Sequence, residues 1–299
     1  MTKLPFVDAH VHLWDLDHIR YPWLTPPFAD DGPNGSVEPI AKTYLLDDYR
    51  TDAGDWDVRG IVHVDAGADP ADAAEETRWL QAMADREGLP SAIIAFAYLG
   101  DPDVDTLLAA HAAHANVRGI RHIVNWHRDP RRTYTPRDVT QDEAWGRGYA
   151  RLSAHGLSFD LQAYPGQFAG LARLIERHPE TPVMINHMGM CVPGEEGAWR
   201  QGLAALARLP HVAIKLSGIG FTHRPWILEQ ARALVLTAID LFGTDRAMVA
   251  SDFPTDKLFG SFAETLGAYA TITADFTDAE RRALFAGNAN RLYRLGLTL

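Results

Sequence analysis

The sequence predicts an α/β fold, a single distorted (β/α)8 TIM barrel with a long loop after strand 1. Two observations carry this prediction: apolar strand-like runs alternate with amphipathic helix patterns along the chain, and the length of 299 residues is usual for one such barrel. Strict alternation implies parallel strands joined by right-handed crossovers. A doubly wound open sheet is the alternative, but its Gly-rich phosphate fingerprint is missing. The nearest candidate, Gly218-Ile219-Gly220, has His223 where a third glycine would stand.

The composition predicts one soluble domain over residues 1–299. Apolar residues make up 46% of the chain, enough for a large core, and no change of composition marks a linker. The net charge of -11 argues against nucleic acid or an anionic membrane as a partner. Cys191 is the one cysteine, so the chain has no disulfide framework, and neither a signal peptide nor a transmembrane run is recognisable. We therefore expect a cytoplasmic protein that binds a small-molecule substrate, and association into a homo-oligomer stays open.

The first predicted strand, 6–12, carries two histidines. Its β-branched and alternating polar residues are typical of a short buried strand. Side chains alternate along a strand, so His10 and His12 should project to one side, with Phe6 and Asp8 below them. Two imidazoles on one face can converge on one ion or one substrate atom. A hydrogen-bonded core histidine is the alternative for either ring alone.

The segment 13–55 that follows is expected to be irregular. It is rich in proline, aspartate and aromatic residues, and so long a loop inside a compact domain is usually functional or disordered. Its aromatic residues favour a folded lid. Trp14 and Trp23 could stack on a substrate ring, or they could simply pack the loop onto the barrel.

The rest of the chain alternates regularly between strands and helices. Runs of β-branched and apolar residues predict the strands, and apolar residues three and four positions apart predict the helices. The predicted strands are 58–64, 91–98, 117–125, 157–162, 182–187, 212–217 and 247–251, and the predicted helices are 71–86, 104–115, 141–155, 168–178, 198–209, 226–242, 261–273 and 278–295.

Polar residues stand at the ends of most predicted strands, although the strands leading into them are largely apolar. In this barrel the carboxyl ends of the strands carry the active site, so the pattern predicts an enzyme. The polar residues at or just beyond strand ends include His10, His12, Arg121, His122, His127, Gln162, His187, Lys215 and Asp252.

Closure of the barrel brings strand 8 beside strand 1, and therefore Asp252 beside His10 and His12. With His187 across the mouth, these residues form a nitrogen and oxygen shell for one Zn²⁺ or other divalent metal with an open water position. A metal-free site fits equally well, with Asp252 taking a proton from water while the imidazoles and Arg121 polarise a carbonyl. Lys215 is expected to be either a substrate contact or a partner of Asp252.

Several motifs resemble the amidohydrolase superfamily, specifically its amidohydrolase-2 branch of lactonases and related metal-dependent hydrolases. The first is Val7-Asp8-Ala9-His10-Val11-His12. Its companions are Trp14 with Tyr21-Pro22-Trp23-Leu24, Val117-Arg118-Gly119-Ile120-Arg121, Asn186-His187-Met188-Gly189, Ile214-Lys215-Leu216-Ser217-Gly218, Ser251-Asp252-Phe253-Pro254 and Asn288-Ala289-Asn290-Arg291-Leu292-Tyr293. Each motif is weak alone, but their order and spacing cover the whole chain.

The resemblance implies a hydrolase that opens a lactone of a sugar acid or of a carboxylated ring compound. It implies His10, His12, His187 and Asp252 as the catalytic or metal-binding set, with Arg121 as a carbonyl or carboxylate contact. Strand 4 has no lysine that could be carbamylated, so a binuclear metal site is not expected. The alternatives are a metal-dependent decarboxylase, a hydrolase of a cyclic amide or imide, and a binding protein without activity.

Our mechanistic hypothesis makes Asp252 the general base on a water that attacks the lactone carbonyl. A basic loop, 126–137, suggests an anion site for an acidic substrate, and the alternative is a solvated loop paired with Asp129 and Asp138. The expected substrate contacts are Trp14, Trp23, His122, His127, Gln162 and Lys215.

Overall fold

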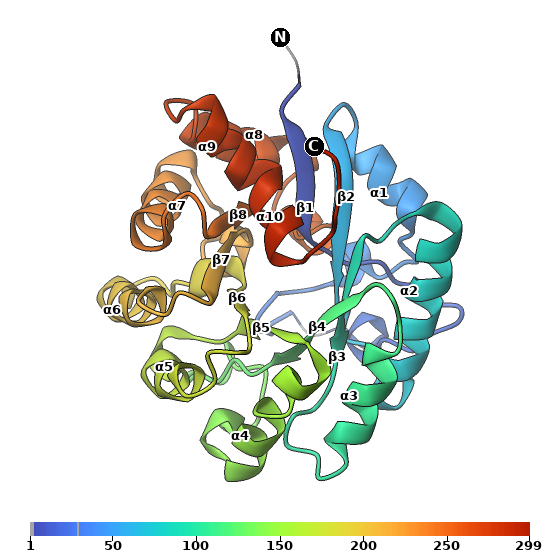
Figure 1. Ribbon diagram of the computed structural model, residues 1–299. Coiled ribbons are helices and arrows are strands. Elements are labelled where there is room, and N and C mark those ends of the chain that lie inside the picture. Colours follow the sequence, from blue (N-terminus) through green and yellow to red (C-terminus); the bar gives the residue numbers. More distant parts are fainter. Residues whose placement is uncertain (1–2, 29) are drawn as a thin grey trace.

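A computed structural model describes residues 3–28 and 30–299 of the chain. One parallel sheet of eight strands in the order β1 to β8 curls into a nearly closed barrel, with helices around it (Figure 1). The predicted (β/α)8 fold is therefore confirmed. The strands are β1 (Pro5–Val11), β2 (Asp57–Val64), β3 (Ala92–Phe96), β4 (Val117–Ile123), β5 (Ser158–Gln162), β6 (Val183–Ile185), β7 (Val212–Leu216) and β8 (Ala247–Val249).

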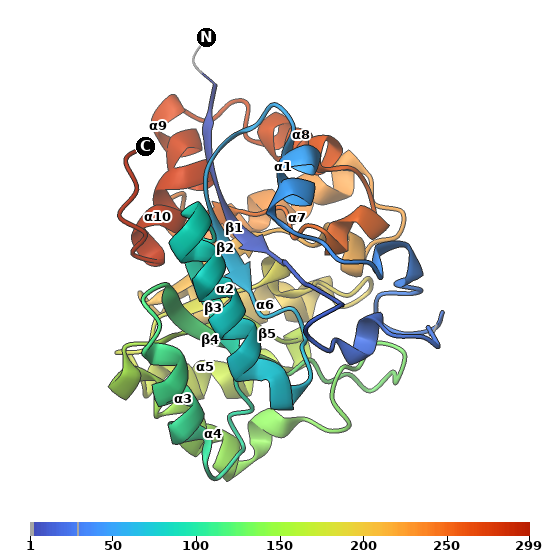
Figure 2. The same cartoon turned by 90° about the vertical axis from the view of Figure 1, so that its right-hand side faces the viewer.

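The helices cover the outside of the barrel, as the turned view in Figure 2 also shows. Two of the predicted helices are interrupted. The predicted helix 141–155 consists of an α-helix and a 3₁₀ turn (Leu152–His155), and the predicted helix 278–295 contains a π turn (Ala283–Gly287). The α-helices are α1 (Leu46–Ala53), α2 (Ala73–Glu87), α3 (Val104–Ala112), α4 (Glu143–Tyr149), α5 (Phe168–Glu176), α6 (Glu196–Ala207), α7 (Leu228–Phe242), α8 (Phe262–Ile272), α9 (Asp278–Arg282) and α10 (Asn288–Leu292).

Helix α1 lies inside the segment that the sequence predicts to be irregular. It buries Leu46, Tyr49 and Ala53, which share one face of a helix at spacings of three and four residues. The Asp48 carboxylate accepts the backbone N–H of Leu45 at 2.9 Å and so caps the first turn. The long loop after strand 1 is therefore folded and ends in a short helix before β2.

The barrel closes where β1 meets the segment that follows β8. The backbone N–H of Asp252 donates to the carbonyl of His10 at 2.9 Å, and the N–H of His12 donates to the carbonyl of Phe253 at 2.8 Å. The Asp8 carboxylate takes the place of a carbonyl at this seam, because it accepts the backbone N–H of Ser251 at 2.9 Å. Closure therefore sets Asp252 beside the histidine pair.

Strand β1 does not alternate as the sequence predicts. Its pairing with β2 shifts register between Asp8 and Val11. Phe6 packs with aromatic residues of the outer layer, such as Phe262 of α8, and the Asp8 carboxylate accepts the hydroxyl of Tyr49 from α1 at 3.0 Å. The prediction that Phe6 and Asp8 share the side of His10 is therefore wrong, because the register shift interrupts the period of two.

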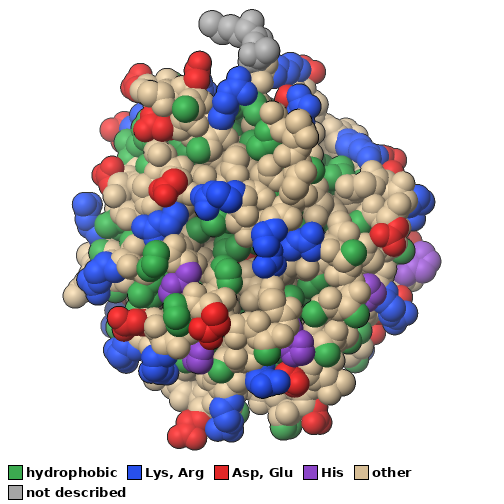
Figure 3. Space-filling model, in the orientation of Figure 1, with side chains coloured by type: hydrophobic (Ala, Val, Ile, Leu, Met, Phe, Trp, Pro, Cys, Tyr) green, Lys and Arg blue, Asp and Glu red, His purple; other side chains and the backbone are tan. Residues whose placement is uncertain are grey.

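The face of the molecule in Figure 3 shows acidic and basic side chains interspersed, with hydrophobic side chains scattered between them. None of the helices in the described part of the chain is both long and apolar enough to cross a membrane.

Candidate active site

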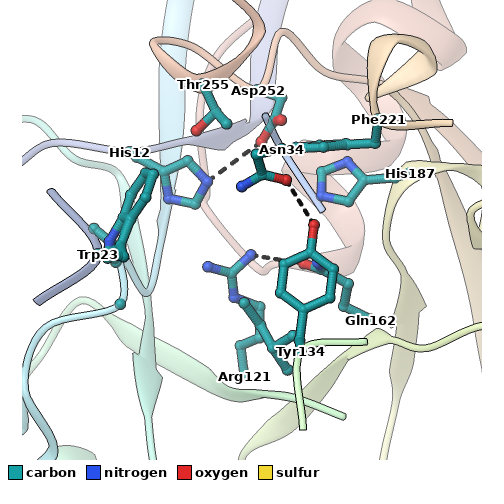
Figure 4. Close-up of a pocket in the computed structure, with 13 residues that line it drawn as sticks. His12, Trp23, Asn34, Arg121, Tyr134, Gln162, His187, Phe221, Asp252 and Thr255 are labelled. Atoms are coloured by element: carbon teal, nitrogen blue, oxygen red, sulfur yellow. Dashed lines mark hydrogen bonds and ion pairs between the residues drawn. The ribbon is translucent and has the colours of Figure 1, made fainter. Parts of the chain in front are cut away.

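A cavity of about 270 Å³ opens at the carboxyl ends of the strands. Its floor is polar and its side walls are largely aromatic or aliphatic (Figure 4). The residues that line it are His12, Trp23, Asn34, Ala66, Gly67, Arg121, Ile123, Tyr134, Gln162, His187, Phe221, Asp252 and Thr255.

Three buried groups converge at this floor. The Nε2 atoms of His10 and His12 lie 3.2 Å apart, and Oδ1 of Asp252 lies 3.3 Å from each of them. A tetrahedral ion with bonds of about 2.0–2.1 Å to its ligands separates those ligand atoms by roughly 3.3 Å. The triangle therefore has the size that one divalent metal requires.

The protonation of the two imidazoles decides how readily this donor set would bind a metal. Nδ1 of His12 lies 2.7 Å from the carbonyl of Val64, so its proton sits on Nδ1 and Nε2 presents a lone pair. Nδ1 of His10 lies 3.4 Å from the ammonium of Lys215, and its Nε2 lies 3.4 Å from the guanidinium of Arg121. Both cations can only donate and a neutral ring has one lone pair, so one of the two contacts faces the ring proton. Nε2 binds a cation only when that proton lies on Nδ1, beside Lys215.

Asp252 fits both a metal ligand and a general base. It is fully buried, and among the described residues neither of its carboxylate oxygens has a partner in hydrogen-bond geometry. Burial alone would raise the pKa of Asp252, but opposing charge interactions, among them that with the permanently charged Arg121, outweigh burial and hold that pKa below its ordinary value. The carboxylate is therefore ionised at neutral pH and has lone pairs free for water or an ion.

His187 enters the cavity directly after β6. Its Nδ1 lies 3.0 Å from the hydroxyl of Ser217, and burial lowers the pKa of the imidazole to about 3. The ring is therefore neutral at physiological pH. His187 and Asp252 have φ angles of 52° and 60°, a left-handed conformation that costs a non-glycine residue about 1–3 kcal/mol. The fold holds both residues in strained backbone to aim them at one space.

Arg121 of β4 supplies a permanent positive charge to the floor. Its guanidinium donates to the Asp65 carboxylate at 3.3 Å, to the Asp65 carbonyl and to Oε1 of Gln162 at 3.1 Å. Arg121 is the one lysine or arginine among the described residues that line the cavity. Its charge is already paired, and its donors are fixed in place by Asp65 and Gln162.

A second buried network supports His10 from below. The Lys215 ammonium lies 2.5 Å from the Asp160 carboxylate, which also accepts the hydroxyl of Tyr293 at 3.0 Å. Burial, and then the charge of Lys215, holds the pKa of His10 well below its ordinary value. His10 is therefore a neutral imidazole held between Lys215 and the floor of the cavity.

The structure brings most of the predicted site together. His12, His187, Arg121, Asp252, Trp23 and Gln162 line the cavity, and His10 lies directly behind it.

Four of the predicted substrate contacts do not line this cavity. The indole of Trp14 donates to the carbonyl of Lys42, and His122 accepts the indole N–H of Trp145. His127 lies 3.2 Å from Glu195. Contact of substrate with Trp14, His122, His127 or Lys215 stays a prediction, and each of these side chains has a protein partner instead.

The basic loop pairs most of its cations with nearby acids. Arg131 lies 3.1 Å from Asp129, Arg128 lies 3.6 Å from Glu195, and Arg137 pairs with Asp142. This arrangement favours the solvated, paired loop over an anion site, although Asp142 replaces the predicted Asp138.

Seven cavity residues were not predicted from the sequence. Asn34 and Tyr134 come from loops, and Phe221 and Thr255 come from short 3₁₀ turns, where no periodic pattern places a side chain. Ala66, Gly67 and Ile123 carry no reactive group that could have marked them.

A comparison with protein families agrees with the resemblance seen in the motifs. The family model described as Amidohydrolase matches residues 7–295. The chain belongs to the amidohydrolase family. The match covers every strand of the barrel except the first residues of β1, so the whole cavity lies inside it.

Three relatives illustrate how this amidohydrolase compares with known proteins. It is 41% identical to "Uncharacterized protein y4mH" of Sinorhizobium fredii, over 99% of this chain and 100% of that protein. It is 28% identical to an L-fucono-1,5-lactonase of Burkholderia multivorans, over 97% of this chain and 96% of that protein. The crystal structure of an amidohydrolase from Burkholderia multivorans with bound zinc superposes with a TM-score of 0.79 at 26% identity, over 97% of this chain and 99% of that chain.

Proposed function

We propose that this amidohydrolase is a lactonase, a hydrolase that opens an uncharged, hydroxylated cyclic ester. The observation that carries the proposal is Asp252, a buried and ionised carboxylate that faces the cavity with both oxygens free of hydrogen-bond partners among the described residues. A carboxylate in this state can take a proton from water as the water attacks a carbonyl. The lactonase relative from Burkholderia multivorans supports the same class of reaction.

The neighbours of Asp252 would orient the attacking water and stabilise the developing oxyanion. His12 presents a lone pair at Nε2, so it can accept a proton of the same water and orient it. If the Ser217 hydroxyl donates to Nδ1 of His187, the proton of that ring lies on Nε2 and can be donated to the developing oxyanion, together with the guanidinium of Arg121. Asp252 would then return its proton to the departing ring oxygen.

His10, His12 and Asp252 would hold a divalent metal if one binds. Such an ion would supply a Lewis acid for the carbonyl oxygen. The neutral ring of His10 and the free carboxylate oxygens of Asp252 fit this role, and the zinc-containing relative supports it. The roles of His187, Arg121 and the residues of the cavity wall do not depend on the ion.

The charges of the cavity favour a neutral substrate over an acidic one. Arg121 already pairs with Asp65, and Asp252 adds negative charge. A carboxylate on the substrate would therefore find no unpaired lysine or arginine among the described cavity residues.

A pH-indicator screen tests the proposal. The panel contains neutral 1,5-aldonolactones, lactones that carry carboxylates, and cyclic imides, with CO₂ release from aromatic acids measured in parallel. We expect acid release from the neutral lactones, at a rate about 10²–10⁴ lower in the Asp252→Asn variant. CO₂ release, or imide opening without lactone opening, would contradict the assignment.

A further inference from the structure

Two polar side chains from distant parts of the chain meet across the mouth of the cavity. The hydroxyl of Tyr134 donates to Oδ1 of Asn34 at 2.7 Å, although the two residues are 100 positions apart. Figure 4 shows them pointing toward one another between His12 and His187. The pair therefore spans the space that a substrate ring must occupy.

Tyr134 stands on a firm support. Its backbone N–H donates to the carbonyl of Asn125, directly beyond β4, at 2.9 Å. The hydroxyl of Thr133 donates to the carbonyl of Thr135 at 2.9 Å, and the hydroxyl of Thr135 donates to the carbonyl of Arg137 at 2.9 Å. These bonds fix the backbone on both sides of Tyr134, so its ring enters the cavity in a defined position.

Asn34 is held by a different loop. Arg224, from the segment between β7 and α7, donates to the carbonyl of Pro33 and to the carbonyl of Gly220 at 2.8 Å. The same guanidinium lies 4.8 Å from the ring centre of Phe259, where a cation–π contact adds to its attachment. Loops that follow three different strands are thus joined at the mouth.

The chemistry of the pair suits hydroxyl groups. The nearby walls consist of Trp23, Phe221 and Ile123, which offer stacking and packing surface but few hydrogen bonds. An amide and a phenol are neutral, and each can both donate and accept. The Asn34 oxygen accepts the Tyr134 hydroxyl, and its amide group adds two N–H donors that a substrate hydroxyl can use.

We propose that Asn34 and Tyr134 form a specificity pair that binds hydroxyl groups on the substrate ring, away from the carbonyl under attack. The inference rests on the proposed lactonase function and adds the residues that select the substrate. In the free enzyme the two side chains hydrogen-bond to one another. When substrate binds, its hydroxyl groups take the place of that hydrogen bond. A ring without hydroxyls gains nothing from either group.

The test compares two lactones with the same six-membered ring. One is a 1,5-aldonolactone that carries hydroxyls, and the other is δ-valerolactone, which carries none. We expect Tyr134→Phe and Asn34→Ala each to lower kcat/KM for the aldonolactone about tenfold, the effect of one lost hydrogen bond. The value for δ-valerolactone should change less than about threefold, because those bonds never form.

Tyr164→Phe is the matched control. Tyr164 belongs to the same apolar cluster as Tyr134, but its hydroxyl donates to the carbonyl of Arg132 at 2.8 Å and it does not line the cavity. The ratio of kcat/KM for the two lactones should therefore stay at the wild-type value. If Tyr134→Phe lowers the melting temperature strongly, Asn34→Ala provides the same comparison from the other loop.

A loss of kcat/KM for the aldonolactone alone supports the specificity pair. Equal losses for both lactones, or no loss for either, overturn the specificity pair while leaving the lactonase in place. A wild-type enzyme that opens neither lactone overturns the proposed function, and the inference with it.

Discussion

Replacing Asp252 with asparagine should remove catalysis and leave the fold intact. Asparagine has the shape of aspartate, and it tolerates the φ of 60° at this position. Its amide nitrogen can donate to Nε2 of His12, which lies 3.3 Å from Oδ1 and presents a lone pair. Arg121 keeps Asp65 as its partner, so no buried charge loses its counterion. We therefore expect a melting temperature within a few degrees of the wild type.

The rate should fall by about 10²–10⁴, the usual contribution of a positioned general base. This loss corresponds to about 2.7–5.5 kcal/mol in the activation free energy. Initial rates from a pH-indicator assay measure it, and melting followed by circular dichroism tests the fold. A variant that keeps kcat within about threefold of the wild type would refute the role of Asp252 as the base.

Asp256→Asn is the matched control. Asp256 is also buried in the same segment, where burial and then the charge of Asp252 raise its pKa well above the ordinary value. The carboxyl is therefore protonated, and an amide is close to it in shape and charge. We expect the rate to fall less than about tenfold, far less than in Asp252→Asn.

Further predictions concern pH, backbone strain, stability and metal. Because the pKa of Asp252 lies below its ordinary value, protonation of this carboxylate should lower kcat/KM only in strong acid, and an inflection near pH 6–7 that Asp252→Asn abolishes would contradict this. Gly218→Ala sets a Cβ 2.5 Å from Nδ1 of His187 and should abolish most activity, whereas Gly156→Ala has the same positive φ with open space and should only lower stability, by about 1–2 kcal/mol. Burial raises the pKa of Glu76 to about 8, so the folded state keeps a proton that the unfolded chain loses above about pH 4.5. Glu76 should therefore lower the stability to urea as pH rises toward 8, by at most about 1.4 kcal/mol per pH unit from this group, and Glu76→Gln should remove that contribution. Calorimetry should find one Zn²⁺ per chain, bound more tightly at pH 8 than at pH 6 with release of a proton. An ion on Nε2 of His10 turns the ring proton toward the Lys215 ammonium 3.4 Å away, which must then lose a proton, and equal affinity at both pH values would contradict this coupling.

The sequence was sufficient to predict the parts of the site that strand order determines. Alternating strands and helices imply a closed barrel, and closure alone brings Asp252 to His10 and His12. The register shift in β1 was not predictable from alternation, which assumes an unbroken period of two. The buried residues of helix α1 are spaced three and four positions apart, a pattern that predicts a helix. The many proline and aspartate residues around it favoured an irregular segment instead.

The loops explain what the sequence could not predict. Trp14 and Trp23 belong to one segment, yet Trp14 is sealed against Lys42 while Trp23 faces the cavity and donates to the carbonyl of Ala66 at 2.8 Å. Asn34 reaches the mouth because Arg224, far along the chain, holds the carbonyl beside it. Contacts of this kind between remote segments leave no local pattern in the sequence.

The seam held by Asp8 has a consequence for how the enzyme becomes active during its synthesis. The Asp8 carboxylate accepts its hydrogen bond from the backbone N–H of Ser251, a residue near the other end of the chain. A growing polypeptide that has not yet passed β8 carries His10 and His12 without Asp252. Catalytic competence should therefore arise at the end of translation, when most of the barrel has already emerged from the ribosome and the last strand docks against the first.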